Sequence, residues 1–243
     1  MAFPNSEGKR VPEVTFRTRT NGQWKDVTTK ELFGGKRVAV FSLPGAFTPT
    51  CSGSHVPRFN DLAPALKRNG IDSIVCLSVN DAFVMDAWSK DQHADNITFI
   101  PDGNGEFTQA MGLLVDKKNL GFGARSWRYS MVVKDGLIEK MFIEPEKEGD
   151  PFEVSDAETM LHWLAPDAKI PHEVVMFSKP GCSFCAKARE LLKSKGMAFD
   201  EIESSQRRLL AVSGKKTTPQ VFIDGQLIGG SDDLEKYLAS HAG

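Results

Sequence analysis

The same short pattern occurs twice in this chain: an apolar run, a turn with proline and glycine, and a cysteine that begins an amphipathic segment. In the first copy, RVAVFSL at 37–43 precedes PGAFTPT and Cys51; in the second, EVVMF at 173–177 precedes SKPG and Cys182. The apolar run predicts a buried strand, and the amphipathic segment predicts a helix. We therefore expect a thiol at the start of a helix at two places in the fold.

Apolar and amphipathic runs alternate after each cysteine, which is typical of α/β domains. In the first part, the sequence predicts a strand at 37–43, a helix at 51–69, a strand at 71–79, a helix at 81–91, a strand at 97–101, a hairpin around Asp135-Gly136 and a helix at 156–164. In the second part, it predicts a strand at 173–177, a helix at 182–194, a strand at 198–202, a helix at 206–213, strands at 219–224 and 226–230, and a helix from Asp232. The proline-containing segment 165–172 predicts a linker. Two α/β domains are expected, 1–168 and 169–243.

The bulk composition excludes several functional classes. The chain has 243 residues and a formal net charge of -2, with 40% hydrophobic and 26% charged residues, as in ordinary globular proteins. Without a basic patch, nucleic acid is not an expected partner. The N-terminus MAFPNSEGKR lacks the apolar core of a signal peptide, and no apolar run is long enough to span a membrane. These features predict a cytoplasmic protein that binds neither nucleic acid nor membranes.

Four cysteines, Cys51, Cys76, Cys182 and Cys185, are too few and too unevenly spaced for the disulfide framework of a secreted domain. At a helix N-terminus, free N–H groups and the helix dipole favour a thiolate and can lower a cysteine pKa from about 8.5 to about 3.5–7.5. The Cys-x-x-Cys motif that starts at Cys182 could also be half of a zinc site, but no second such motif or spaced histidine pair accompanies it. We predict a redox thiol at Cys182 and no metal site.

The segments FSKPGCSFC, KTTPQVFIDG and IGGSDDL closely resemble glutaredoxins over nearly all of residues 172–240. The resemblance implies a cis peptide bond between Thr218 and Pro219 and a site for glutathione. The residues implied for this site are Lys179, Thr218, Pro219, Gly230, Ser231 and Asp232. Lys216 is a further candidate for the glycyl carboxylate, and a solvated surface lysine is an equally good interpretation.

Glutaredoxins usually carry Cys-Pro-Tyr-Cys, whereas this chain has Ser183 and Phe184 between the cysteines. The departure puts the thiol pKa and the redox potential in doubt, but it leaves the nucleophile in place. We expect a monothiol cycle at Cys182 in which Cys185 is largely dispensable, because a second glutathione molecule can reduce a glutathione mixed disulfide.

Cys51 ends another motif, Pro44-x-x-x-Thr48-x-x-Cys51. Peroxide reduction needs a thiolate, a donor that aligns the O–O bond, and a positive group for the leaving oxygen. The motif, with KRVAVFSLPGAFTPTCS, LSVND, GLLVD and RYSMVV, resembles the peroxiredoxin-5 (type II) subgroup of peroxiredoxins over about residues 3–165. By that resemblance, Thr48 hydrogen-bonds the peroxide and the Cys51 sulfur. Pro44 shields the pocket from water, and Arg128 fixes the thiolate and polarises the oxygen.

Three nearby residues have competing interpretations. Arg125 is the alternative to Arg128 as the catalytic cation. His55 could tune the thiolate, but a histidine satisfied by backbone hydrogen bonds is favoured, so it is left out of the catalytic set. Cys76, in the run IVCLSV, is expected to be an inert buried thiol, although it is the one candidate in its domain for a resolving cysteine.

Together the resemblances imply two thioredoxin-like domains, each a central mixed β-sheet flanked by helices, that share one reaction cycle. Hydrogen peroxide or an alkyl hydroperoxide oxidises Cys51, glutathione caps the sulfenic acid, and Cys182 removes the glutathione. Glutathione is then a reducing co-substrate, no cofactor is tightly bound, and a separate glutathione reductase regenerates it. The resemblance also implies a homo-oligomer, dimer or tetramer, through the peroxiredoxin domains.

Two rival functions remain open at this stage. One is a redox sensor that passes a disulfide from Cys51 through Cys182 to a client protein. The other is a glutaredoxin with a structural passenger domain. The linker leaves open whether Cys182 serves Cys51 of the same chain or of another subunit. A flexible tether of about eight residues spans about 15–17 Å and could let the two sites of one chain meet, whereas a stiff tether would direct Cys182 to another subunit.

Overall fold

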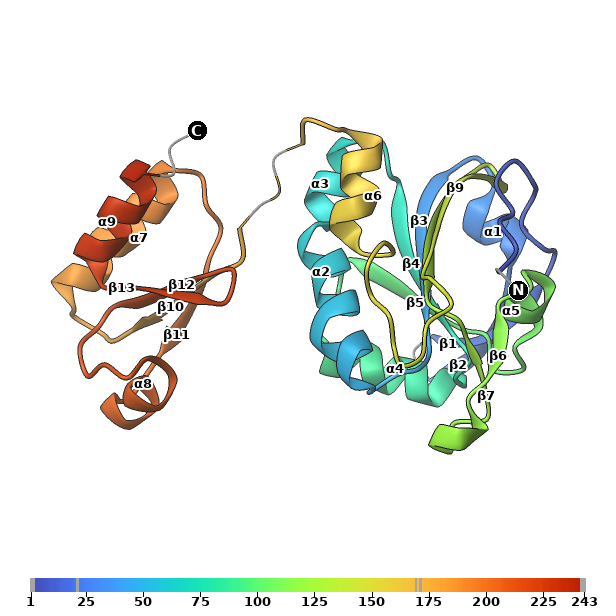
Figure 1. Ribbon diagram of the computed structural model, residues 1–243, viewed down its shortest axis with the longest axis horizontal. Helices are drawn as coiled ribbons and strands as arrows, with labels where there is room; N and C mark the ends of the chain where they lie inside the picture. The colour runs from blue at the N-terminus through green and yellow to red at the C-terminus, as the bar shows by residue number, and fades with distance from the viewer. Residues whose placement is uncertain (1–2, 21, 169, 171, 241–243) are drawn as a thin grey trace. The chain divides into compact units, whose positions relative to one another are not determined.

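The computed structural model describes residues 3–20, 22–168, 170 and 172–240. Contacts between residues divide the chain into two compact units, Met1–Ala168 and Lys169–Gly243, and each unit has a sheet with helices packed against it (Figure 1). Both sheets contain parallel and antiparallel strand pairs. The mixed α/β sheet that the sequence predicts is confirmed for each unit. Within the described residues, no helix is long and apolar enough to cross a membrane.

The first unit is built on a five-stranded sheet. Its order is β5 (Ile97–Pro101), β4 (Ser73–Ser78), β3 (Arg37–Leu43), β8 (Tyr129–Lys134) and β9 (Leu137–Ile143). Strands β3, β4 and β5 are parallel, whereas β8 is antiparallel to β3 and β9 is antiparallel to β8. The predicted Asp135-Gly136 turn joins β8 to β9, with positive φ at both residues, as a tight hairpin requires. Two short ribbons complete the strands, β1 (Thr15–Thr20) with β2 (Gln23–Thr28) and β6 (Leu114–Asp116) with β7 (Ala124–Ser126).

Helices cover both faces of this sheet (Figure 1). Their bounds are α1 (Thr29–Phe33), η1 (Cys51–His55), α2 (Val56–Asp61), α3 (Ala63–Arg68), α4 (Ala82–Asp91), α5 (Glu106–Ala110), η2 (Lys118–Leu120) and α6 (Ala157–Leu164). On one face, Phe33 of α1 and Phe107 of α5 join a hydrophobic core cluster with Val38 and Val40 of β3. On the other face, Phe41 of β3 stacks on Phe59 of α2, with ring centroids 4.3 Å apart. The central strand is therefore buried on both sides, and the chain leaves the sheet where β3 ends.

The predicted single helix at 51–69 is wrong in its continuity. The chain instead forms a π-helical turn, η1, followed by α2 and α3, which meet at Leu62. Pro57 and Pro64 each lie in the first turn of a helix. Proline has no N–H to donate and its ring clashes with the preceding turn, so each proline starts a new helix rather than continuing the old one.

The second unit has a four-stranded sheet in the order β11 (Asp200–Glu203), β10 (Val174–Ser178), β12 (Gln220–Ile223) and β13 (Gln226–Gly229). Only the β10–β11 pair is parallel among these described strands. The helices are α7 (Ser183–Ser194), α8 (Gln206–Ser213) and α9 (Ser231–Ser240). The core joins α7 and α9 to the sheet through Ala188, Leu192, Leu234 and Leu238. The turn between β10 and α7 ends at Cys182, and the other three residues of the Cys-x-x-Cys motif form the start of α7, as expected.

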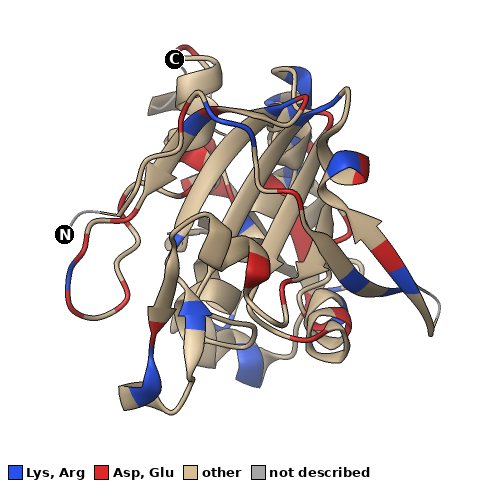
Figure 2. Cartoon of the chain, turned by 90° about the vertical axis from the view of Figure 1, so that its right-hand side faces the viewer, with Lys and Arg blue, Asp and Glu red and all other residues tan. Residues whose placement is uncertain are grey.

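Charged residues of both signs are interspersed over the first unit. Figure 2 shows Lys and Arg positions next to Asp and Glu positions along its strands and loops. With a formal net charge of -2, the chain as a whole is close to neutral. Local contacts rather than a long-range field must therefore set the electrostatics of its sites.

Candidate active sites

Cys51 is the first residue of η1 and is completely buried. It follows β3 and the loop 44–50, so the strand end fixes the place of the thiol. Cys76 of β4 is also completely buried and pairs in register with Phe41 of β3. Burial, and secondarily the nearby Cys51 sulfur, raises the pKa of the Cys76 thiol well above its usual range. The structure thus brings the two cysteines of this unit close together, and it disfavours a thiolate at Cys76.

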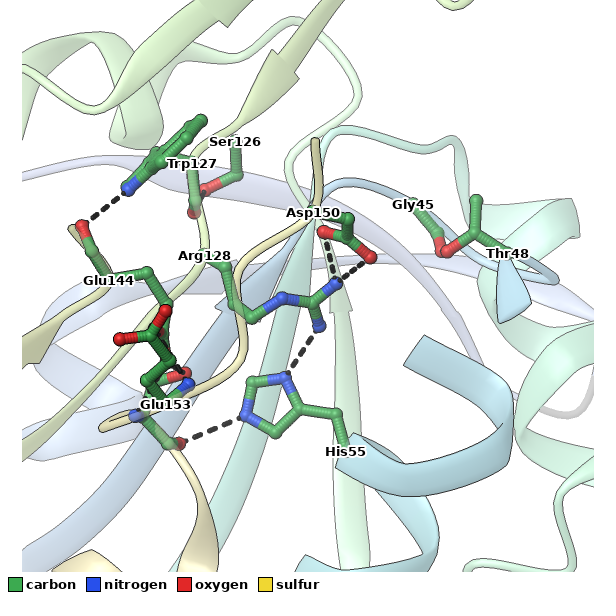
Figure 3. Close-up of polar contacts among 10 residues, drawn as sticks. Gly45, Thr48, His55, Ser126, Trp127, Arg128, Glu144, Asp150 and Glu153 are labelled. Atoms are coloured by element: carbon green, nitrogen blue, oxygen red, sulfur yellow. Dashed lines mark hydrogen bonds and ion pairs between the residues drawn. The ribbon is translucent and has the colours of Figure 1, made fainter. Parts of the chain in front are cut away.

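The loop that precedes Cys51 is held from the neighbouring strand end. The side-chain oxygen of Asn80 accepts hydrogen bonds from the Ala46 amide at 3.0 Å and from the Ser78 hydroxyl at 2.7 Å. The Thr48 hydroxyl donates to the Gly45 carbonyl oxygen at 2.8 Å (Figure 3). The Thr48 hydroxyl therefore bonds within its own loop. The resemblance had implied a bond from this hydroxyl to the Cys51 sulfur, and no such bond is present among the described residues. Sequence reasoning missed Asn80, because LSVND gives no sign of which loop its side chain reaches.

Arg128 is buried between two partners (Figure 3). Its Nη1 atom donates to His55 Nδ1 at 3.1 Å, and its Nη2 atom lies 2.5 and 2.6 Å from the two carboxylate oxygens of Asp150. The Phe152 ring lies 5.4 Å from the guanidinium carbon. The Nε atom is buried and has no hydrogen-bond partner among the described residues. Among the described residues, no hydrogen bond joins Arg128 to Cys51, and the two are linked through His55 of η1, the turn that begins at Cys51.

His55 is completely buried and its two ring nitrogens have different partners. Nε2 lies 3.1 Å from the Ser155 carbonyl oxygen, which can only accept, so Nε2 carries the proton and Nδ1 accepts from Arg128. Burial, and next the Arg128 charge, lowers the pKa of His55 well below 6.5. The backbone bond that the sequence analysis favoured for His55 is present, but the histidine also orients Arg128.

Glu144 anchors the segment that covers Arg128. Its buried carboxylate accepts hydrogen bonds from the amides of Glu153, Val154 and Ser155 at 2.8–2.9 Å, and from the Ser155 hydroxyl at 2.7 Å. The Trp127 indole N–H donates to the Glu144 carbonyl oxygen at 2.9 Å (Figure 3). These bonds hold the Ser155 carbonyl oxygen where it accepts the hydrogen bond from His55 Nε2. Neither Glu144 nor Asp150 was predicted from the sequence, because nothing in the spacing of these acidic residues shows that they reach Arg128 and its covering segment.

Arg125, the alternative cation, lies near the other side of the loop 44–50. It donates to the Val79 carbonyl oxygen and lies beside Gly45. Arg125 is half-buried, whereas Arg128 is only 1% exposed. The two arginines thus have different surroundings, and the buried one is held on the turn of Cys51.

Cys182 caps the N-terminus of α7, and its sulfur accepts from the Cys185 amide at 3.2 Å. The Thr218 hydroxyl donates to the same sulfur at 3.5 Å, and the Thr218–Pro219 peptide bond is cis, as the resemblance implied. Burial opposes ionisation, but donation from Cys185 and Thr218 and the charge of Lys179 lower the pKa of Cys182. Cys185 is buried, and chiefly for that reason its pKa is raised.

A groove of about 800 Å³ opens beside Cys182. It brings together all six residues implied for glutathione binding and also Lys216; these are Lys179, Thr218, Pro219, Gly230, Ser231, Asp232 and Lys216. At the N-terminus of α9, two of these groups already have partners within the chain. The Gly230 amide donates to Asp233 at 3.0 Å, and Asp232 pairs with Lys187 at 2.9 Å. In the described part of the chain, no cluster of three or more His, Cys, Asp or Glu side chains could hold a metal ion.

Comparisons with known proteins match both units. The Redoxin family model matches residues 6–161, and the Glutaredoxin model matches residues 174–228. The hybrid peroxiredoxin hyPrx5 of Haemophilus influenzae is 62% identical over 96% of this chain and 98% of its own. A peroxiredoxin of Synechocystis is 57% identical over 64% of this chain and 89% of its own. The structure of reduced Prx3 from Vibrio vulnificus in complex with H₂O₂ superposes with a TM-score of 0.63, at 42% identity, over 66% of this chain and 99% of that one.

Proposed function

Because this chain belongs to the redoxin family as a peroxiredoxin followed by a glutaredoxin domain, we propose that it is a glutathione-dependent peroxidase whose two thiols act in sequence. Both domains are thioredoxin-like, and membership of the peroxiredoxins implies the activity of a peroxidase, which is an oxidoreductase. The route by which Cys51 is recycled is the part that we infer.

In the first step, the Cys51 thiolate attacks a hydroperoxide, becomes a sulfenic acid and releases the alcohol or water. The sulfenic acid needs a thiol before a second peroxide oxidises it further. Cys76 is a poor candidate because its raised pKa disfavours the thiolate. Glutathione therefore condenses with the sulfenic acid, which releases water and leaves a Cys51–glutathione mixed disulfide.

The observation that carries the recycling step is the contrast between Cys182 and Cys185. Cys182 lines the groove and its pKa is lowered, whereas Cys185 is buried and its pKa is raised. The Cys182 thiolate attacks the glutathione sulfur and frees the Cys51 thiolate. A second glutathione then takes the first one from Cys182 as glutathione disulfide. One accessible, half-buried thiol is enough for this exchange.

The proposal also covers partners. Hydroperoxides and glutathione are the substrates, a separate glutathione reductase returns glutathione disulfide to glutathione, and the protein acts in the cytoplasm. The peroxiredoxin domains associate into a dimer or tetramer, so Cys182 serves Cys51 of the same chain or of another subunit.

The test is the consumption of hydrogen peroxide with glutathione as the sole reductant, followed through glutathione reductase and NADPH. Sustained turnover supports the peroxidase. A single oxidation per chain, followed by a stable mixed disulfide with a client protein, would instead support the redox sensor. Peroxide turnover that survives Cys51→Ser would support a glutaredoxin with a passenger domain.

A further inference from the structure

Two elements hold the Arg128 guanidinium from opposite directions (Figure 3). His55 belongs to η1, which begins at Cys51, so the contact at Nη1 binds the guanidinium to the turn that carries the thiol. Asp150 belongs to the connection between β9 and α6 and holds Nη2 through both carboxylate oxygens. Of the three nitrogen atoms, only Nε is left with no partner in the described structure.

The two partners of Arg128 do different things. The His55 ring accepts a hydrogen bond as a neutral group, so it orients the guanidinium but does not offset its charge. Asp150 supplies a negative charge to a cation that is 1% exposed, and a buried cation without such a partner is strongly destabilising. Contacts at two different nitrogens, Nη1 with His55 and Nη2 with Asp150, restrict the rotation of the guanidinium plane.

The place of Asp150 is built into the fold. Glu144 binds the amides of Glu153, Val154 and Ser155 shortly after Asp150 in the chain. Phe152 lies against both Arg128 and His55. Its ring centroid is 5.4 Å from the guanidinium carbon of Arg128 and 4.9 Å from the centroid of the His55 ring. Asp150 therefore reaches Arg128 from an anchored segment, although its own side chain is 41% exposed.

We propose that Asp150 is a positioning residue for the reaction of Cys51: through Nη2 it fixes the Arg128 guanidinium that His55 ties to the Cys51 turn, and it offsets part of the Arg128 charge. This inference rests on the proposed peroxidase function. A fixed donor that needs no reorientation as charge develops contributes more to the rate than a mobile one.

The experiment uses the full-length chain with Cys182→Ser and Cys185→Ser, so that the reactive thiol is Cys51. Asp150→Asn and Asp150→Ala are compared with Glu153→Gln, a matched control whose carboxylate pairs with Lys147 at 2.8 Å on the same segment. Two quantities are measured: the rate constant of Cys51 with hydrogen peroxide, and the ratio of its rates with anionic iodoacetate and neutral iodoacetamide.

Both substitutions of Asp150 raise the iodoacetate-to-iodoacetamide ratio about three- to tenfold, because one negative charge near the thiol is lost. Asp150→Ala lowers the peroxide rate constant about tenfold, whereas Asp150→Asn, which keeps a hydrogen-bond acceptor, lowers it less. In an Arg128→Gln background, Asp150→Ala leaves the peroxide rate constant unchanged, since no guanidinium remains to be held.

An unchanged reagent ratio in Asp150→Asn overturns the electrostatic part, and an unchanged peroxide rate constant in Asp150→Ala overturns the positioning part. An equal effect of Glu153→Gln would overturn both. Since Asn is nearly isosteric with Asp, the first comparison stands even if Asp150→Ala folds poorly. Failure of the peroxidase proposal is recognised separately. In the chain that keeps Asp150 and Glu153, Cys51 would then react with peroxide no faster than free glutathione does.

Discussion

The Oγ1 atom of Thr218 lies 3.5 Å from the Sγ atom of Cys182, although 36 residues separate the two in the chain. The hydroxyl donates to the sulfur from the loop just before β12, while the Cys185 amide donates to it from α7. Two elements of the glutaredoxin domain thus stabilise the same thiolate, and this pair of donors can be tested directly.

Thr218→Val removes the hydroxyl donor and should raise the pKa of Cys182. The measurement is the rate of alkylation of Cys182 by iodoacetamide as a function of pH. In the unsubstituted chain, a lowered pKa moves the midpoint below that of an ordinary thiol, and Thr218→Val moves it upward. Thr217→Val is the control, because the exposed Thr217 side chain does not bond to the sulfur. Identical pH profiles for all three proteins would show that the hydroxyl does not stabilise the thiolate.

Substitutions of the four cysteines should have clearly different effects in one turnover assay with peroxide and glutathione. Cys51→Ser abolishes peroxide reduction, and Cys182→Ser allows one oxidation of Cys51 but stops glutathione-driven turnover. Cys185→Ser keeps substantial turnover, because the monothiol route does not use that buried sulfur. Cys76→Ala is the control for a buried thiol outside the cycle and also stays active.

Two results of that assay would contradict the scheme. An inactive Cys185→Ser protein would exclude the monothiol route. Full turnover by Cys182→Ser with glutathione alone would show that the fused domain is not the path to Cys51.

Lys179→Met should raise the KM for glutathione about three- to fivefold. Lys179 lines the groove beside Cys182, where its ammonium can pair with a carboxylate of glutathione. The effect stays modest because the lysine is exposed and exposed ion pairs contribute up to about 1 kcal/mol. Lys195→Met, at the far end of α7, is the control. The same KM in both variants would argue against glutathione binding at Lys179.

The stability of the chain should depend on pH through His55. The pKa of His55 is lowered well below 6.5 in the folded state, chiefly by burial, so below about pH 6.5 the unfolded chain binds a proton that the folded chain does not. Stability is therefore lost as the pH falls, by up to about 1.4 kcal/mol per pH unit for one group. Urea unfolding between pH 7 and 5 measures this slope.

His55→Gln removes that component and should flatten the pH dependence, even if it also lowers the overall stability. His162→Gln is the control, because His162 is exposed on α6. If His55→Gln and His162→Gln show the same slope as the unsubstituted chain, the buried histidine does not carry this pH dependence.

Local sequence signals predicted the main elements because those signals are short-range. The strand at 37–43 and the turn at Asp135-Gly136 agree with the structure, since an apolar run and a turn dipeptide act within a few residues. The continuous helix after Cys51 failed because the amphipathic pattern outweighed Pro57 and Pro64 in the interpretation. The short helix α1 was missed although TTKE carries its signal: Thr28 and Glu31 form a capping box.

By itself, the sequence determined two α/β units and the local place of each thiol at the end of a strand, because strand period, turn chemistry and a helix start are encoded by neighbouring residues. Only the tertiary structure decided which groups surround those thiols. Asp150 meets Arg128 across 22 residues, and Arg128 meets His55 across 73. Such contacts depend on how β8, η1 and the β9–α6 connection pack together, and the spacing of residues along a chain carries no direct record of that packing.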